Sequence, residues 1–568
     1  MLCKVICGAT RGIEVIPVTI EVDVSPGIAF FLVGLPDNAV KESQQRISAS
    51  LQKLGFKIPG KKIIINLAPA NVRKEGSAFD LPIAVGILAA SGQLELTGLN
   101  RYLIAGELAL DGTLRAINGA LPLIIYARDT GLEGIILPTA SACEGIEIEG
   151  IDIYAANTLQ EVIEILLSNG GNKQYLVKQR IEREYSGKFI SANGQNGLPL
   201  LKITESINRT NEYDFKDIKG QQLAKKGLEV AAAGGHNLIM TGSPGSGKTL
   251  LAKSITSILP PLSREESIQT SVIYSIAGEL NSHMGLIKRR PFRQPHHTST
   301  LQAITGGGSH ILPGEISLAH CGVLFLDEFA EFPRSVIEVL RQPLEDRIIQ
   351  LSRVRSKITY PASFMLIAAM NPCPCGYLDD ESGKCNCTSY MIERYRSRVS
   401  GPILDRIDIR LKIRPVPKNL LVDDSQAEPS SVIAERVAKA REIQLERFKG
   451  EHFFTNSEIP SPLVKKYCRL AESEKKYLMS VIEKMDISAR RYNRILKLSR
   501  TIADLSGETD IRTAHIMQAF HLSYQHRYEQ IGEYHQLRQN FALRPESPKL
   551  PNESEGGCPI RGYGTDEG

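Results

Sequence analysis

Residues 236–249 read HNLIMTGSPGSGKT, and no other stretch of the chain constrains its structure as strongly. The apolar run HNLIMT leads directly into a glycine-rich loop of the pattern G-x-x-x-x-G-K-[ST], and LLAKSITSIL follows with the character of a helix. A strand, a glycine-rich loop and a helix N-terminus in this order aim backbone N–H groups at phosphates. The stretch therefore predicts an α/β domain that binds ATP through Gly242, Ser243, Pro244, Gly245, Ser246, Gly247, Lys248 and Thr249.

A second apolar run, about 80 residues later, ends in two carboxylates. Residues 322–328 read GVLFLDE, so Asp327 and Glu328 follow a predicted strand. In the P-loop, Lys248 is expected to reach the β- and γ-phosphates and Thr249 to ligate Mg²⁺. Asp327 is then expected to hold the hydrated Mg²⁺, and Glu328 to polarise the attacking water. The pair predicts an ATP hydrolase that uses Mg²⁺ rather than a protein that only binds nucleotide.

Length and charge limit the remaining possibilities. The chain has 568 residues, which predicts several domains. Lys and Arg number 68 against 63 Asp and Glu, a net charge of +5, so any nucleic-acid contact must be local. The opening residues lack a basic start followed by a long apolar run, and no window is apolar over the length that a membrane span needs. We expect a cytoplasmic protein with no membrane partner.

Composition and periodicity divide the chain into blocks. Short Val/Ile-rich runs alternate with helical patterns in the front block and again around the P-loop, which is the α/β pattern. A stretch rich in Asn, Gly and Ser separates these blocks, and a region with Glu, Lys, Arg and Leu at helical spacing follows them. The prediction is an α/β front domain at 1–166, a linker at 167–213, an α/β ATPase domain at 214–412, a helical domain at 413–535 and a disordered tail at 536–568.

Four of the ten cysteines cluster as two C-x-C pairs shortly after a third apolar run at residues 364–370. A disulfide framework is not expected in a reducing compartment. Four thiolates can close a tetrahedral structural Zn²⁺ site, although C-x-x-C spacing is commoner. An iron–sulfur cluster and free thiols are the alternatives. The predicted zinc ligands are Cys373, Cys375, Cys385 and Cys387.

The ordered motifs GSPGSGKT, GVLFLDE, AAMNP and LDRID resemble those of the AAA+ ATPases. The resemblance is to the helix-insert branch, which includes the ChlI/BchI magnesium chelatase subunits and the MCM replicative motors. The third apolar run, residues 364–370, ends in Asn371, whose amide can orient the attacking water. By resemblance, Asn371 is the first sensor, Arg406 is the arginine finger that reaches a neighbouring subunit's ATP, and Arg490 is the second sensor.

Two of these assignments have competitors. Arg491 could take the role given to Arg490. Arg406 lies between Asp405 and Asp408, and adjacent opposite charges are usually solvated ion pairs. An arginine finger acts only in trans, so this assignment implies a ring of subunits.

Longer motifs extend the resemblance over about residues 1–530. GLPDNAVKESQQRI, INLAPANVRKEGSAFDLPIA, RPFRQPHHTST, LPGEISLAHCGVLFLDE and MNPCPCG together resemble the ComM/YifB group of Mg chelatase-like bacterial ATPases. The resemblance implies a homo-hexameric ring that uses ATP hydrolysis to move on single-stranded and branched DNA. The implied work is helicase or branch-migration activity in natural transformation and recombination, with recombination proteins as further partners.

Residues 62–138 of the front block resemble the proteolytic domain of Lon, which uses a serine and a lysine. An ungapped match of KEGSAFDLPIA to the serine segment of that family puts Ala78 at the nucleophile. The following match places Leu123 at the lysine. A one-residue gap could recruit Ser77, but LPLIIYA holds no lysine to activate it. Without nucleophile and base, acyl transfer has no route, so a Lon-like, non-proteolytic domain is predicted.

Two basic stretches are candidates for DNA contact. In the helix-insert branch the corresponding positions line the central pore, where cations can follow a phosphate backbone with little sequence preference. The other interpretation of each stretch is a solvated surface. The candidate contacts are Lys288, Arg289 and Arg290, with Arg293 nearby, and Arg353 and Arg355, with Lys357 nearby.

Two rival functions share the nucleotide chemistry. A chelatase-type ATPase would remodel a protein partner for metal insertion and would use every nucleotide residue named above. An ATP-dependent protease would need the serine–lysine pair that the front block lacks. The basic stretches and the cysteine cluster favour DNA as the partner.

Overall fold

The computed structural model describes residues 2–186, 213–280, 285–308, 311–353, 356–378, 383–417, 427–485 and 487–528. Met1–Ser523 forms one compact unit and Tyr524–Gly568 a second. Of the second unit only the end of helix α22 is described, so the predicted tail at 536–568 lies outside the described residues. In the described part of the chain, no helix has the length and apolar character needed to cross a membrane.

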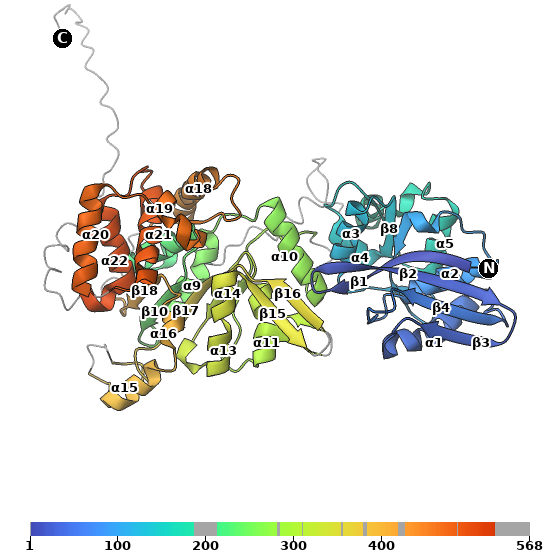
Figure 1. Ribbon diagram of the computed structural model, residues 1–568, viewed down its shortest axis with the longest axis horizontal. Helices are drawn as coiled ribbons and strands as arrows, with labels where there is room; N and C mark the ends of the chain where they lie inside the picture. The colour runs from blue at the N-terminus through green and yellow to red at the C-terminus, as the bar shows by residue number, and fades with distance from the viewer. Residues whose placement is uncertain are drawn as a thin grey trace, which may run out of the picture. The chain divides into compact units, whose positions relative to one another are not determined.

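The front domain is built on a mixed seven-stranded sheet with strand order β3-β4-β2-β1-β5-β8-β9 (Figure 1). The long antiparallel pair β1–β2 turns at Arg11 and Glu14, and β5, β8 and β9 continue the sheet in parallel. The strands are β1 (Leu2–Arg11), β2 (Glu14–Ser25), β3 (Ala29–Val33), β4 (Lys62–Ala68), β5 (Tyr102–Ile104), β8 (Gly134–Pro138) and β9 (Asp152–Ala156).

Helices of the front domain begin and pack for reasons visible in the sequence. Helix α1 (Asn38–Lys53) is capped by Asp37, which accepts a hydrogen bond from Val40 N. Helix α2 (Asp80–Ala90) is apolar on all sides and every residue of it is buried, as expected for a helix inside the core against β1 and β2. Helix α3 (Ala120–Asp129) buries its first turns, and α5 (Leu159–Leu167) is capped by Thr158. The α/β prediction for this block is consistent with these elements.

The linker predicted for 167–213 differs from the structure at its start. A 3₁₀ turn at Lys173–Tyr175 and helix α6 (Val177–Ser186) continue the front domain beyond residue 166. The sequence there is polar, so its packing depends on few residues: Val177 and Ile181 are buried, and the Arg180 guanidinium bonds Glu161 and Ala155 O. Residues 187–212 of the predicted linker lie outside the described residues.

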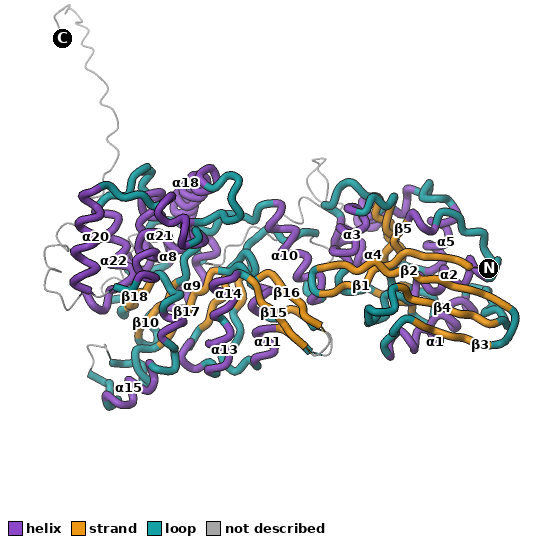
Figure 2. Tube along the Cα trace, in the orientation of Figure 1, coloured by secondary structure: helices purple, strands orange, loops and turns teal. Residues whose placement is uncertain are grey.

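The ATPase domain contains a five-stranded sheet of order β11-β14-β17-β10-β18, in which every neighbouring pair is parallel (Figure 2). The apolar runs VLFL and MLIAAM are buried at every position, as parallel strands covered on both faces require. Parallel strands place their carboxyl ends at one sheet edge, so the residues after three of these strands meet there. The strands are β10 (Leu238–Gly242), β11 (Phe292–Arg293), β14 (Val323–Leu326), β17 (Met365–Met370) and β18 (Ile409–Ile413).

Short helices and two hairpins complete this domain. Helix α8 (Gln222–Gly234) precedes β10, α9 (Lys248–Ser254) follows the P-loop, and α10 (Arg264–Ala277) begins with a capping box of Ser263 and Glu266. The small pair β12 (Gly306–Gly307) and β13 (Leu312–Pro313) lies between α11 (Leu301–Thr305) and α12 (Glu315–Leu318). After α13 (Arg334–Val339) and α14 (Arg341–Asp346), β15 (Ile348–Arg353) and β16 (Ser356–Pro361) form an antiparallel hairpin that precedes β17.

The C-terminal block is helical, as predicted, and polar contacts tie it to the ATPase sheet. His236, just before β10, contacts Asp408 through Nδ1 at 3.1 Å and Thr501 through Nε2 at 2.8 Å. Burial alone would raise the pKa of Asp408, but the bond to His236 and the nearby Arg494 lower it to about 2. The helices are α18 (Ser430–Arg447), α19 (Val464–Tyr467), α20 (Glu472–Met485), α21 (Ala489–Leu505) and α22 (Thr513–Tyr528).

Candidate functional site

The P-loop connects β10 to α9 as the sequence predicts. Gly245 and Gly247 have φ of 73° and 88°, a region that glycine enters without penalty, and Gly247 is the residue before the first turn of α9. The loop opens on a cavity of about 410 Å³. Its walls are Pro244, Gly245, Ser246, Gly247, Lys248, Thr249, Leu250, Asp327, Glu328, Met370 and Asn371. Three strand ends far apart in the sequence thus contribute to one cavity.

The Lys248 ammonium is held inside this cavity by oxygen atoms. Its Nζ donates to Gly242 O at 2.8 Å, to Ser243 O at 2.9 Å and to Asn371 Oδ1 at 3.3 Å. Burial lowers the pKa of Lys248, while the carboxylates of Asp327 and Glu328 act in the opposite direction. Lys248 is therefore placed to contact a bound phosphate as well as Asn371, the predicted first sensor.

Two side-chain oxygen atoms that could ligate Mg²⁺ lie side by side. Thr249 Oγ1 donates to Asp327 Oδ2 at 2.8 Å. Hydroxyl and carboxylate oxygens are the ligands that Mg²⁺ prefers, usually together with water and substrate phosphates. The two side chains therefore fit the ion that the sequence assigned to them.

Glu328 has an unusual backbone and an unforeseen partner. Its φ is 52°, a left-handed conformation that costs a non-glycine residue about 1–2 kcal/mol, and its N–H donates to Asp327 Oδ1 at 3.0 Å. The carboxylate is about half exposed to the cavity, and its Oε2 lies 3.0 Å from His297 Nδ1. His297 therefore fixes the position of the predicted water-activating group.

Sequence reasoning did not identify His297 as a site residue. The residue belongs to the quoted motif RPFRQPHHTST and follows β11 by four positions. β11 is two residues long, too short to show a strand period, so nothing in the sequence placed it beside β14. The adjacent His296 instead contacts Thr298 Oγ1 through Nδ1 at 2.8 Å.

The predicted arginine finger is engaged within its own chain. Arg406 Nη2 lies 2.6 Å from Glu345 Oε1, and Nη1 donates to Pro402 O at 2.8 Å. The side chain is 7% exposed, and its Nε is buried without a hydrogen-bond partner. Arg406 thus forms its ion pair with Glu345, whereas the sequence suggested Asp405 or Asp408.

The two candidates for the second sensor differ in their surroundings. Arg490 is exposed in the first turn of α21. Arg491, the next residue, pairs with Asp405 at 2.9 Å. The roles given to Arg406, Arg490 and Arg491 stay predictions.

The four cysteines after Asn371 converge. The Sγ atom of Cys373 lies 3.3 Å from that of Cys375 and 3.8 Å from that of Cys385, and Cys375 and Cys385 are 3.6 Å apart. All four Sγ atoms, including that of Cys387, lie within 4.8 Å of one another. A tetrahedron with Zn–S bonds of about 2.3 Å puts sulfurs about 3.8 Å apart, so the cluster fits zinc.

The environment of the cluster supports metal binding and links it to the P-loop. A hydrogen bond from the backbone of Tyr377, with contributions from the other thiols, lowers the pKa of Cys375 to about 6, whereas Cys375 and Cys373 raise the pKa of Cys385 and of Cys387, so that the metal-free cluster favours one thiolate. Gly376, in the same loop, has φ of 86°, and a Cβ there would lie 2.7 Å from Pro244 Cδ. The cysteine loop therefore packs directly on the P-loop through a position that only glycine fits.

The structure separates the members of the first basic stretch. Lys288 pairs with Glu147 at 3.2 Å, Arg290 with Glu266 at 2.9 Å. Arg293 pairs with Glu315 at 2.7 Å and with Glu279 at 2.9 Å. A phosphate would have to compete with these carboxylates, which weakens the assignment of Lys288 and Arg290 as DNA contacts. Arg289 is exposed and lines a second cavity.

The second basic stretch occupies the end of the β15–β16 hairpin. Arg353 is the last residue of β15 and is paired with Ser356, the first residue of β16. Arg355 and the side chain of Arg353 lie outside the described residues, and Lys357 is exposed on β16.

The positions matched to a serine protease dyad hold no reactive groups. Leu123 is 2% exposed in α3 and packs so closely on β1 that a Cβ at Gly8 would lie 2.5 Å from Leu123 Cδ2. The hydroxyl of the neighbouring Ser77 donates a hydrogen bond to the Glu107 carboxylate, and the ammonium group of the buried Lys74 donates one to Pro69 O.

Comparisons with known proteins agree with this arrangement. Three family models match: "Magnesium chelatase, subunit ChlI" over residues 214–421, "Subunit ChlI of Mg-chelatase" over 20–141 and "Magnesium chelatase, subunit ChlI C-terminal" over 427–523. The competence protein ComM of Haemophilus influenzae is 42% identical over 520 residues, which cover 90% of this chain and 95% of that protein.

Two further relatives bear on the family and on the front domain. The uncharacterized protein YifB of Escherichia coli is 39% identical over 513 residues, 90% of this chain and 95% of that protein. Lon protease 2 of Bacillus subtilis is 28% identical over 145 residues, 25% of this chain and 26% of that protein. Because ComM and YifB are matched over nearly their whole length, the chain belongs to the ComM/YifB family of magnesium chelatase-like AAA ATPases.

Proposed function

We propose that this protein is a ring-forming motor that hydrolyses ATP to move on DNA, as a helicase or branch-migration enzyme in natural transformation and recombination. The observation that carries the hydrolytic part is the convergence of P-loop, carboxylates and amide: Lys248 contacts Asn371, and Thr249 contacts Asp327. Lys248 binds the phosphates, and Thr249 with Asp327 would hold Mg²⁺, which neutralises the charge developing on them. Glu328, fixed by His297, accepts a proton from the attacking water.

The DNA part of the proposal rests on the relative and on the hairpin. A chain 42% identical over nearly the whole length carries the name competence protein. The sequence that contains β15 and β16 holds Arg353, Arg355 and Lys357 within five residues, and between Ile348 and Pro361 it holds no acidic residue. Cations so placed contact phosphates without reading bases, which suits a motor that must pass any sequence.

The proposed homo-hexameric ring rests on the assignment of Arg406 as an arginine finger. An arginine that acts on a neighbouring subunit's ATP must leave or share its partner Glu345 when subunits assemble. The Nε atom of Arg406 is buried without a hydrogen-bond partner, which costs free energy. A rearrangement that gave this donor an acceptor would therefore be favourable. Assembly with a second chain would supply acceptors from that chain's bound nucleotide.

Zinc at the four-cysteine cluster is a structural element of the proposal. Cys373, Cys375, Cys385 and Cys387 would hold the ion with no open position for a substrate. Because Gly376 of this loop packs on Pro244, the ion would brace the P-loop. Elemental analysis of purified protein should find about one zinc per chain. Absence of zinc after reconstitution, with iron and labile sulfide in its place, would assign the cluster to the alternative metal centre.

A salt titration tests the DNA function. Full-length protein should bind a labelled single-stranded oligonucleotide with an affinity that falls steeply with salt, and DNA should stimulate ATP hydrolysis. The double variant Arg353→Gln/Arg355→Gln should lower the log–log salt slope by about 1.4, at roughly 0.7 per lost single-strand contact. A matched control is Lys61→Gln/Arg73→Gln, two exposed cations of the front domain. A wild-type ring that ignores DNA but hydrolyses faster with a protein partner would favour the chelatase-type function that the family models name.

A further inference from the structure

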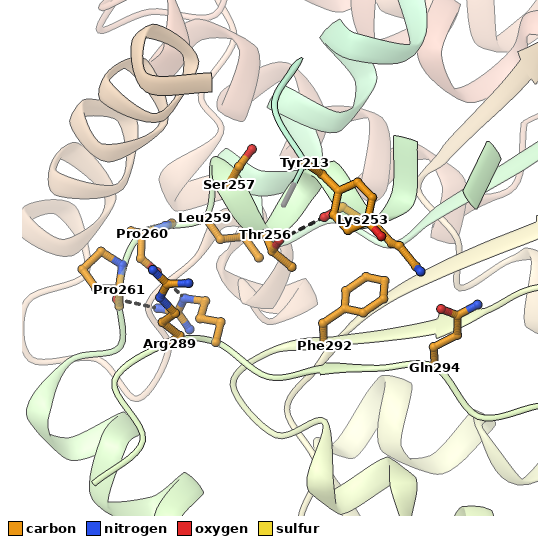
Figure 3. Close-up of a pocket in the computed structure, with 11 residues that line it drawn as sticks. Tyr213, Lys253, Thr256, Ser257, Leu259, Pro260, Pro261, Arg289, Phe292 and Gln294 are labelled. Atoms are coloured by element: carbon orange, nitrogen blue, oxygen red, sulfur yellow. Dashed lines mark hydrogen bonds between the residues drawn. The ribbon is translucent and has the colours of Figure 1, made fainter. Parts of the chain in front are cut away.

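A second cavity, of about 580 Å³, opens beside the nucleotide site and shares no lining residue with it. It lies between the end of α9, the loop at Pro260 and Pro261, and the start of β11 (Figure 3). Its size falls in the range of small-molecule sites, about 300–1,000 Å³. The lining residues are Tyr213, Lys253, Thr256, Ser257, Leu259, Pro260, Pro261, Arg289, Arg290, Phe292 and Gln294.

The charges in this lining have one sign. It includes three cations and no Asp or Glu. Arg290 is neutralised by Glu266 at 2.9 Å, but the structure records no carboxylate partner for Lys253 or Arg289 within the ranges it describes. Arg289 thus differs from Lys288, Arg290 and Arg293 of the same stretch, each of which is paired. Two uncompensated cations favour an anionic ligand.

Two aromatic rings add a second kind of contact. Tyr213 and Phe292 approach the space from opposite sides, with Lys253 and Gln294 beside them (Figure 3). Phe292 is backed by the fully buried Phe325, with ring centroids 5.8 Å apart, so its face is held in place. The Lys253 ammonium lies 5.5 Å from the centroid of Tyr213. Flat rings beside free cations are the combination that binds unstacked bases and their phosphates.

We propose that this cavity binds single-stranded nucleic acid, with a base against Tyr213 or Phe292 and separate backbone phosphates on Lys253 and on Arg289. The Gln294 amide offers both a donor and an acceptor to a base edge. The inference deepens the proposed function and rests on it. A free nucleotide has the same chemistry, so the experiment includes it as a separate arm.

The walls of the cavity connect it to the ATP site. Helix α9 supplies Lys248 and Thr249 to one cavity and Lys253 to the other. The segment from Phe292 to His297 lines the second cavity at one end and contacts Glu328 at the other. A strand bound here would touch the two elements that position the hydrolytic groups.

Photocrosslinking of the full-length protein tests the site directly. A fluorescein-labelled dT15 carrying 5-iododeoxyuridine is irradiated with the protein in saturating ADP and Mg²⁺, which keep the P-loop occupied. Peptide mapping should find the crosslink on Tyr213 or Phe292. Persistence of the crosslink in millimolar thymidine monophosphate supports the nucleic-acid strand, and its displacement supports a free nucleotide.

Matched variants measure the contribution of each contact. Arg289→Gln should weaken dT15 binding about fivefold and lower the log–log salt slope by about 0.7, whereas Lys288→Gln, its paired neighbour outside the cavity, should stay within twofold. Phe292→Leu keeps an apolar contact with Phe325 but loses the flat face, and should weaken binding about fivefold or more. Thermal unfolding checks that the variants fold.

The outcomes separate this inference from the proposed function. Crosslinks confined to the β15–β16 hairpin, with Arg289→Gln equal to Lys288→Gln, overturn the cavity site and leave the DNA function intact. A crosslink in the cavity that thymidine monophosphate displaces, without salt-sensitive dT15 binding, supports the cavity as a nucleotide site and removes the DNA function. If neither dT15 nor thymidine monophosphate binds wild-type protein, both proposals fail.

Discussion

The ATPase domain and the front domain are both α/β structures, yet only one of them keeps reactive groups. In the ATPase domain, three parallel strands end in Lys248 of the P-loop, Asp327 with Glu328, and Asn371, and these side chains meet in one cavity. In the front domain, the positions that match the protease dyad hold Ala78 and Leu123, and Leu123 is part of the core. The ATPase domain thus keeps both its fold and its reactive side chains, whereas the front domain keeps the fold without the reactive side chains.

The difference shows what holds each feature in place. The front-domain fold depends on buried apolar residues, such as the fully buried helix α2, and these remain when the reactive residues do not. Catalysis depends on a few polar groups at strand ends, which the fold tolerates but does not require. Likeness to Lon over 145 residues is therefore evidence for a fold and not for proteolysis.

The largest effect is expected from Glu328→Gln, which should leave the ATPase domain folded but, like the front domain, without catalytic activity. Loss of the carboxylate that accepts the water proton should lower kcat about a thousandfold, within the range for a general base. ATP binding should stay within about twofold, because Lys248 and Thr249 are untouched. Phosphate release and binding of a fluorescent ATP analogue measure the two effects.

A nearby carboxylate controls for charge. Glu331→Gln makes the same change three residues along, at a side chain that pairs with Arg398. It should keep near wild-type turnover. Equal activity of the two variants would remove the role assigned to Glu328.

The next largest effect is expected from Arg406→Ala, which tests whether one subunit holds every residue needed to hydrolyse ATP. Arg406→Ala should bind ATP and lower hydrolysis at least about a hundredfold, the cost of losing one group that stabilises transition-state charge. Mixing Arg406→Ala with Lys248→Ala subunits should restore part of the activity, because some interfaces then combine an intact P-loop with an intact finger. Mixtures that exchange subunits yet stay as inactive as both parents would argue that Arg406 acts within its own chain, through Glu345.

A smaller effect tests how the catalytic carboxylate is positioned. His297→Ala should lower kcat about tenfold with little change in KM, because Glu328 Oε2 loses its contact at 3.0 Å while the phosphate contacts remain. His297→Asn, whose amide can donate, should recover part of the loss. The neighbour His296→Ala is the control, since His296 contacts Thr298. Equal kcat values for His296→Ala and His297→Ala would mean that the contact does not position Glu328.

These residues also show how far sequence alone reaches. The P-loop, Asp327, Glu328 and Asn371 could be predicted to meet because each follows a long apolar run, and parallel strands align their ends. His297 could not, because β11 is only two residues long. The pairing of Lys288 with Glu147 was also beyond reach, because it joins residues 141 positions apart in two blocks whose packing no local pattern encodes.

Misplaced boundaries have a similar cause. Helix α6 lies in a polar stretch that reads as linker, and it forms because Val177, Ile181 and the Arg180–Glu161 pair pack on the front domain. Propensity is a weak signal beside such tertiary contacts. The cysteine cluster, by contrast, was predictable from spacing, because four thiols within 15 residues are close in any compact loop.

For variants of the front domain we expect no change in peptide cleavage. Ser77→Ala and Ala78→Ser should leave peptide cleavage at the background level, with or without ATP, in assays of casein and of fluorogenic peptides. Ser77 donates to Glu107, and for a serine at position 78 the place matched to the family's lysine holds Leu123. In the protease family a lysine activates the serine, and the buried leucine at the position of that lysine cannot accept a proton. A fluorophosphonate probe that labelled Ser77 in the wild-type chain would contradict this, because covalent labelling requires an activated hydroxyl, and the front domain would then resemble the ATPase domain in retaining its chemistry.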